Sequence, residues 1–132
     1  MIQDFKKLRI WKNARTITGD IYDVTSSFPK QELYGLVSQL RRASVSIGAN
    51  IAEGSAKDSK KEFAYYLQTS SGSAKECQHH LYVAQDARYI SEGTSNSIIA
   101  DLDKLCRMIV SLKKSLNYQN KTNENLTMNL SK

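Results

Sequence analysis

The chain has 132 residues, among them one Pro, six Gly and two Cys, and a formal net charge of +6. This length suits a single domain, and so few turn-forming residues argue against an all-β fold and for an all-α fold. The longest stretches without a charged residue, Phe63 to Ala74 and Ala43 to Ala52, are too short to span a membrane, and two Cys exclude a disulfide framework, so we expect a cytoplasmic protein.

Apolar residues at spacings of three and four predict two helices in the first half of the chain. The first spans residues 10–26, and its stripe consists of Trp11, Ala14, Ile17, Ile21 and Val24. The second begins directly after Pro29, a residue that a first helical turn tolerates, and ends near Gly54. Its stripe consists of Leu33, Leu36, Leu40, Ala43, Ile47 and Ile51.

The second half predicts two further helices. The third spans residues 59–91 and opens with a capping box, in which the Ser59 hydroxyl accepts a hydrogen bond from the amide of Glu62. Its stripe consists of Phe63, Leu67, Ser70, Ala74, Cys77, Leu81 and Ala84. The fourth has the stripe Ile98, Leu102, Leu105, Ile109, Leu112 and Leu116. The pattern ends after Tyr118, so we expect one domain, 1–118, and a disordered polar tail, 119–132.

Short connections make successive helices antiparallel, which predicts an up-down-up-down four-helix bundle. The third helix, about 50 Å long at ~1.5 Å per residue, should extend past its neighbours. Its small residues 69–74 lie level with Ala43 and Ser44, which allows close packing, and Val37 and Val45 form a second apolar line on the second helix. Symmetric self-association is common, so these features favour a homo-oligomer.

The antiparallel topology sorts the charges between the two ends of the bundle. One end, which we call the basic pole, combines nine cations with four acidic residues, for a net charge of +5. Its cations are Lys6, Lys7, Arg9, Lys12, Lys57, Lys60, Lys61, Lys113 and Lys114. The opposite end, the acidic pole, combines seven acidic residues with three cations, for a net charge of −4. Its acidic residues are Asp20, Asp23, Glu32, Asp86, Glu92, Asp101 and Asp103, and its cations are Lys30, Arg88 and Lys104.

The basic pole admits two interpretations. Clustered Lys and Arg bind phosphates and release counterions, which predicts salt-dependent and largely sequence-independent binding of nucleic acid. The alternative is a solvated basic face, in which Lys113 and Lys114 complement the dipole at the end of the fourth helix.

Residues that could carry metal or nucleophilic chemistry are sparse. Glu76 and His79 have the Glu-x-x-His spacing of di-metal bundles, but such a site needs a second motif, which only a symmetric dimer would supply. Cys77 and His80 lack a third polar group to orient a nucleophile, which predicts a core thiol beside a surface imidazole. The scattered glycines form no phosphate loop. We therefore expect no enzymatic activity, no metal and no cofactor.

Several short segments between residues 4 and 116 occur together. They are Phe5, Leu8 and Trp11, then Phe28-Pro29, Glu32, Tyr34-Gly35-Leu36, Gln39-Leu40-Arg41-Arg42-Ala43, Ser46-Ile47, Asn50-Ile51-Ala52-Glu53-Gly54, Glu62-Phe63, Gly72-Ser73 and Glu76. With these segments the chain resembles the bacterial four-helix-bundle family of proteins encoded in intervening sequences of 23S ribosomal RNA genes. The Arg-Arg-Ala and Asn-Ile-Ala-Glu-Gly segments are the most specific of them.

Relatives of that family include the accessory protein of diversity-generating retroelements, a pentamer that binds nucleic acid through a basic surface and partners a reverse transcriptase. The resemblance therefore implies a homo-pentamer with Arg41 and Arg42 as RNA contacts and, on the retroelement branch, a reverse transcriptase as partner. Ser71 stands where the family usually has Arg, so the middle of the third helix is less basic here.

These observations lead to the hypothesis of a non-enzymatic, homo-oligomeric bundle that binds RNA or other nucleic acid through the basic pole. The alternative is an oligomeric scaffold that docks another protein, in which case the basic pole keeps the particle soluble or meets an acidic partner. We expect no membrane partner.

Overall fold

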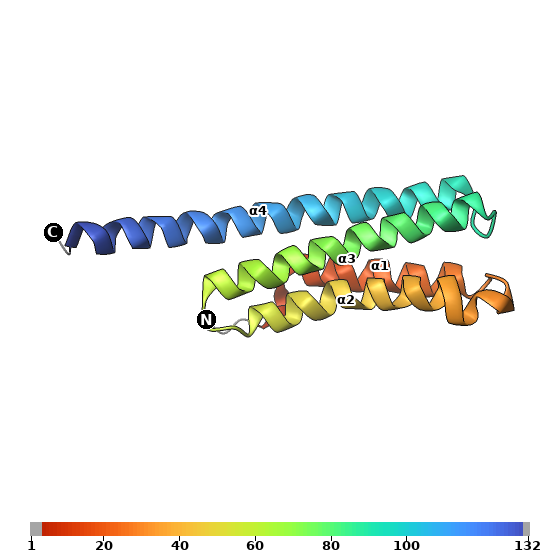
Figure 1. Cartoon of the computed structure of the whole chain (residues 1–132), viewed down its shortest axis with the longest axis horizontal. Coiled ribbons are helices and arrows are strands. Elements are labelled where there is room, and N and C mark those ends of the chain that lie inside the picture. Colours follow the sequence, from red (N-terminus) through yellow and green to blue (C-terminus); the bar gives the residue numbers. More distant parts are fainter. Residues whose placement is uncertain (1–3, 131–132) are drawn as a thin grey trace.

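The structure is a computed structural model that describes the backbone of residues 4–130 and the side chains of residues 4–116. Its long helices are α1 (Arg9–Thr25), α2 (Ser38–Ser55), α3 (Lys60–Asp86) and α4 (Glu92–Leu130). Successive helices run antiparallel (Figure 1), and their apolar side chains meet in one core. The predicted all-α four-helix bundle is therefore confirmed, and no strand occurs among the residues described.

The first helix agrees with its predicted span to within one residue at each end. It follows a 3-10 turn, η1 (Phe5–Lys7), and the ring of Phe5 packs edge-on against Trp11 with 5.0 Å between the ring centroids. The buried residues of α1 are Ile10, Ala14, Ile17, Ile21 and Thr25. Trp11 and Val24, which the pattern also assigned to the stripe, are half-buried at the edge of the core.

The beginning of α2 differs from the prediction. Between Pro29 and Ser38 the chain forms a 3-10 turn, η2 (Lys30–Glu32), and a π-type turn, η3 (Leu33–Val37), so α2 begins later than expected. Gly35 inside η3 has φ −112° and ψ −109°, outside the helical region. A residue without a Cβ tolerates this conformation, so the chain can leave the helical path at Gly35.

The interrupted start removes Leu33 from the core. Its side chain is 49% exposed, whereas the other five members of the predicted stripe are buried. Of the second apolar line predicted for this helix, Val37 is buried in the core and Val45 is exposed, and packing of this line against another subunit stays a prediction.

The third helix begins and packs as predicted. The Ser59 hydroxyl accepts a hydrogen bond from the Glu62 amide over 3.1 Å, and all seven residues of the predicted stripe are buried. The helix ends at Asp86 rather than at residue 91, since Arg88 has φ 63°, in the left-handed region that commonly follows a helix end. α3 is longer than α1 and α2, but α4 is the longest helix and the one that extends past the others (Figure 1).

The fourth helix buries five of its six predicted stripe residues, and Leu112 is half-buried. Its backbone remains helical to Leu130, which differs from the disordered tail expected from residue 119. Backbone hydrogen bonds can extend an existing helix without an apolar stripe, so the loss of pattern did not mark the helix end. The side chains of residues 117–132 lie outside the described part, and the domain boundary at 118 stays a prediction.

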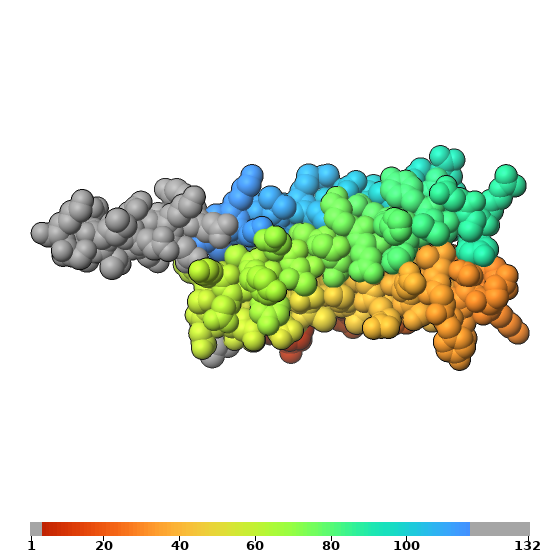
Figure 2. Space-filling view, in the orientation of Figure 1, coloured from red at the N-terminus to blue at the C-terminus, as the bar shows by residue number. Residues whose placement is uncertain are grey.

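Small residues bring α2 and α3 close together, and the two helices lie against each other on the face shown in Figure 2. The Ser70 hydroxyl donates to the backbone oxygen of Ile47 over 2.8 Å, and the hydroxyl oxygens of Ser46 and Ser73 are 2.9 Å apart. On α2 these contacts lie about one helical turn closer to the α2–α3 turn than Ala43 and Ser44, the residues predicted to face this part of α3.

Gly54 lies where α2 contacts the side chains of α3 closely. A Cβ at this position would lie 2.6 Å from the Cβ of Tyr66 and 3.0 Å from Cδ1 of Phe63, so only glycine fits without a shift of α3. In contrast, a Cβ at Gly72 would meet nothing within 4 Å. The small residues of α3 therefore serve close packing only on the side that faces α2.

Candidate nucleic-acid interface

The fold brings the cations of the basic pole to one end of the bundle. The start of α1, the turn between α2 and α3, and the part of α4 beside that turn all lie at this end (Figure 1). Lys113 Nζ on α4 donates to Gln68 Oε1 on α3 over 3.1 Å, which ties this part of α4 to the beginning of α3.

Most of these cations are accessible to a ligand. The exposed ones are Lys6, Lys7, Arg9, Lys12, Lys61 and Lys114, and the half-buried ones are Lys57, Lys60 and Lys113. Lys57 Nζ lies 5.2 Å from the ring centroid of Tyr66, and the Tyr66 hydroxyl donates to Glu53 Oε1 over 3.4 Å. Tyr66 thus positions a cation and an anion at the α2–α3 turn.

Several cations of the basic pole stand where they oppose the helix dipole. Arg9 and Lys12 lie in the first turn of α1, which contains no acidic residue, and Lys60 and Lys61 begin α3. A helix N-terminus carries a partial positive charge, so cations there do not stabilise the helix. Their charge instead adds to that of the two helix N-termini, which together attract anions.

The dipole also fails to explain the lysines of α4. Lys113 and Lys114 lie well inside this helix, which ends only at Leu130. The dipole effect is confined to the last turn of a helix, so these two side chains are not C-terminal charges that stabilise α4.

The acidic pole has the opposite character. Burial raises the pKa of the Asp20 carboxyl, and the neighbouring Asp101 and Asp23 carboxylates raise it further. Carboxylates close enough to disfavour one another's ionisation produce a local negative field. A polyanion is therefore attracted to one end of the bundle and repelled from the other.

Arg41 and Arg42, the contacts implied by the family resemblance, lie away from the basic pole. Arg41 Nε donates to Thr25 Oγ1 over 3.0 Å, and its Nη2 donates to the backbone oxygen of Tyr22 over 3.4 Å. Its guanidinium carbon is 4.6 Å from the ring centroid of Tyr22. Arg41 therefore secures the last turn of α1 to α2, while Arg42 is exposed. That either one contacts RNA stays a prediction.

The residues considered for metal or nucleophilic chemistry form no such centre in the part of the chain described. No group of three or more His, Cys, Asp or Glu there could hold a metal ion. His80 is buried, not at the surface as predicted, because it lies next to the core stripe of α3, and its Nε2 is 3.4 Å from Glu76 Oε1. Burial, with a smaller contribution from Glu76, raises the pKa of the Cys77 thiol to about 12. A protonated thiol is a poor nucleophile.

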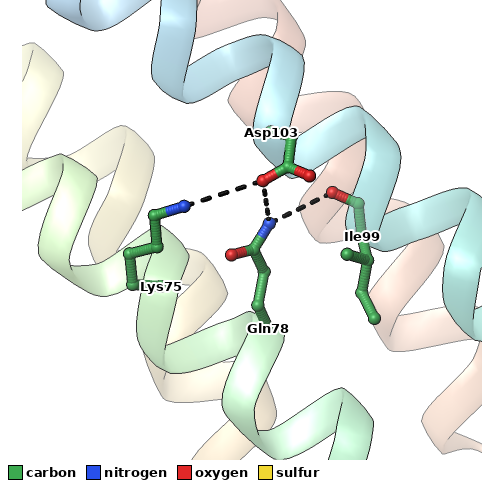
Figure 3. A network of polar contacts seen from close by, with 4 residues as sticks. All are labelled: Lys75, Gln78, Ile99 and Asp103. Atoms are coloured by element: carbon green, nitrogen blue, oxygen red, sulfur yellow. Dashed lines mark hydrogen bonds and ion pairs between the residues drawn. The ribbon is translucent and has the colours of Figure 1, made fainter.

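A polar cluster crosses the interface between α3 and α4 (Figure 3). Gln78 is buried, and its Nε2 donates to the backbone oxygen of Ile99 over 3.1 Å and to Asp103 Oδ1 over 2.7 Å. Lys75 Nζ lies 3.6 Å from the same carboxylate oxygen. The hydrogen bond from Gln78 is the largest cause of a lowered pKa at Asp103, ahead of the charge of Lys75.

Replacing Gln78 with Leu is expected to raise the pKa of Asp103 towards its ordinary value. A lowered pKa in the folded state stabilises the fold above the unfolded pKa, and this contribution disappears as the pH falls through the folded value. The variant should therefore lose less of its stability on acidification than the wild type does. Carboxyl NMR titration measures the pKa directly. Lys75→Gln should raise the pKa of Asp103 by less than Gln78→Leu does. A larger rise would contradict the conclusion that the hydrogen bond from Gln78 lowers this pKa more than the charge of Lys75.

Two cations that charge sorting did not assign to the basic pole lie near Arg9. Arg9 lines a cavity of about 540 Å³ together with Lys104 and Arg107 of α4. Lys104 was counted with the acidic pole and Arg107 with neither pole. Lys104 and Arg107 are three residues apart, so they lie on the same side of α4, and each is close in sequence to a core residue, Leu105 or Ile109. This pattern could have indicated that both side chains lie at the border with a neighbouring helix.

Within the described part of the chain, no helix is both long and apolar enough to cross a membrane. The fold and the charged ends together define an electrically polarised, antiparallel four-helix bundle.

Comparison with known proteins identifies the family. The family described as 23S rRNA-intervening sequence protein matches residues 6–111, and the chain belongs to this family. A solved structure of a protein with unknown function from the S23 ribosomal protein family, from Bacteroides thetaiotaomicron, is 23% identical and has a TM-score of 0.71. The match covers 80% of this chain and 98% of that one, and at this identity it shows the fold alone. No curated protein matches the chain.

Proposed function

We propose that this protein is a non-enzymatic, homo-oligomeric bundle that binds RNA through phosphate contacts from the basic pole. The observation that carries the proposal is the placement of exposed cations in the first turns of α1 and α3. These charges oppose the dipoles of their own helices, so helix stability does not account for them. Phosphate binding accounts for the position of these cations, because helix N-termini and cations both attract anions.

The charge separation adds a second line of support. A chain with a uniformly distributed net charge of +6 would attract RNA from every side, whereas this one concentrates its positive charge at one end. Membership of the rRNA-intervening sequence family and the resemblance to nucleic-acid-binding relatives favour RNA as the anion. On the retroelement branch, a reverse transcriptase would be the protein partner.

Retention of RNA at two salt concentrations tests the proposal. The protein should shift a structured RNA in a gel at ~50 mM salt and release most of it at ~200 mM. The reason is that cations of the salt compete with the lysine and arginine side chains for the RNA phosphates. Absence of binding at either concentration would overturn the proposal. A shift that is insensitive to salt would contradict phosphate contacts as its cause.

Self-association is supported by exposed apolar side chains on adjacent helices. The larger of these on α2, α3 and α4 are Val45, Tyr65, Tyr82, Val83 and Val110. Light scattering coupled to gel filtration should give a multiple of the 14.9 kDa chain mass, and the family resemblance favours five copies. A single-chain mass at micromolar concentration would contradict the homo-oligomer. The exposed apolar side chains would then favour the scaffold alternative, in which they contact a different protein.

A further inference from the structure

The seam between α1 and α4 contains three shallow cavities that are open to solvent, of about 540, 200 and 490 Å³. Lys104 lines the first and the second, and Asp101 lines the second and the third, so the cavities form one groove along the bundle. The groove is cationic at the first cavity, where Arg9 and Arg107 lie, and acidic at the third.

The cationic cavity combines two kinds of surface. Its apolar residues are Ile10, which is buried, and Met108 and Leu112, which are half-buried. Asn13 Nδ2 on α1 donates to the Met108 sulfur over 3.3 Å and so holds the thioether in place. Ser111 and Ser115 add exposed hydroxyls.

The cations beside this apolar surface are available to a ligand. Arg9, Lys104 and Arg107 are exposed, and they make no ion pair within the described residues. The charge of Arg107 contributes to the lowered pKa of Asp103, but that carboxylate already interacts with Gln78 and Lys75. Arginine is suited to phosphate because its guanidinium offers several donors in one plane.

We propose that this cavity binds an unpaired nucleotide of the RNA, with its phosphate at Arg9, Lys104 and Arg107 and its base against Met108, Ile10 and Leu112. The inference rests on the proposed function and adds to it the kind of RNA that is bound. A thioether and aliphatic side chains contact the face of a flat ring favourably, and only an unpaired base exposes its face. The cavity, of about 540 Å³, is open to solvent, so the base would lie against its apolar residues rather than be enclosed by them.

The acidic end of the groove limits the length of strand that is bound. Beyond Lys104 the groove is lined by Asp101, and then by Asp20 and Asp23. Phosphates cannot follow the seam past these carboxylates without repulsion. The site therefore takes one or two nucleotides at the cationic end, and the rest of the RNA lies over the basic pole.

Methionine NMR tests this site directly. The chain has three methionines, Met1, Met108 and Met128, so ¹³C-methyl labelling gives few signals, and Met108→Leu assigns the relevant one. A short uridine oligonucleotide should shift the Met108 methyl signal, and a blunt duplex RNA should shift it much less. In a binding assay, the double variant Arg9→Gln with Arg107→Gln should lower the affinity for the oligonucleotide about tenfold and the affinity for the duplex by less.

The outcomes separate the two proposals. If RNA binds but neither the Met108 signal nor the double variant responds selectively to unpaired RNA, the nucleotide site is refuted and the proposed function stands. If no RNA of either kind binds, both are refuted. If the double variant instead changes the oligomeric mass in light scattering and leaves RNA affinity unchanged, the groove is a contact between copies, which also overturns the nucleotide site.

Discussion

Replacing Gly54 with Ala is expected to lower the free energy of unfolding by about 1–3 kcal/mol, the range for overpacked interiors. The added Cβ would lie 2.6 Å from the Cβ of Tyr66 and 3.0 Å from a ring carbon of Phe63, so α2 and α3 must shift apart at this position. The helix propensity gained from Gly to Ala, about 1 kcal/mol, offsets part of the overpacking cost, so the net loss lies in the lower part of this range. Urea unfolding with an unchanged slope measures the difference.

Gly19→Ala is the matched control for this variant. Gly19 also lies within a helix, α1, but a Cβ there would meet nothing within 4 Å. This variant should gain about 0.5–1 kcal/mol from the lower entropy of its unfolded chain. If Gly54→Ala were equally stabilising, the close approach of α2 and α3 at the basic pole would be contradicted.

The double variant Lys61→Gln with Lys114→Gln is expected to weaken RNA binding about a hundredfold at ~0.1 M salt, because each lost phosphate contact costs about tenfold under these conditions. Both side chains are exposed at the basic pole, one at the start of α3 and the other on α4. The variant should fold normally, since Lys61 opposes the dipole of its helix. Fluorescence anisotropy with a labelled RNA measures the affinity.

A second double variant carries the same net charge with a different distribution. Lys30→Gln with Arg88→Gln also removes two cations from a chain of net charge +6, but from the acidic pole. These side chains are exposed as well. Its RNA affinity should change by less than about threefold, the effect of long-range charge alone. An equal loss of RNA affinity in the two double variants would mean that the net charge of the chain, rather than the basic pole, governs binding.

The sequence pattern predicted the core of the bundle well, because core helices require apolar residues at fixed spacing. All seven stripe residues of α3 and five of six in α4 are buried. The pattern failed at Leu33, where Gly35 interrupts the helix, since spacing does not report the conformation that a glycine adopts. The end of the pattern after Tyr118 did not mark the end of α4, whose backbone stays helical to Leu130.

The candidate interface was predicted less completely than the core. Sorting charges by topology brought the basic-pole cations to one end, because antiparallel order alone determines which segments meet there. It missed Lys104 and Arg107, since their nearness to Arg9 depends on the rotation and register of α4 against α1. Arg41 shows the reverse case, in which a motif residue makes contacts within the chain, to Thr25 and Tyr22, that its sequence does not reveal.

The dependence of RNA affinity on salt concentration, compared between the two double variants, tests the central claim most directly. The logarithm of the association constant should fall linearly with the logarithm of salt concentration. For Lys61→Gln with Lys114→Gln the slope should be shallower than in the wild type by about 1.4–1.8, as expected for two lost phosphate contacts. For Lys30→Gln with Arg88→Gln the slope should match the wild type. Identical slopes for all three proteins would contradict phosphate binding by the basic pole.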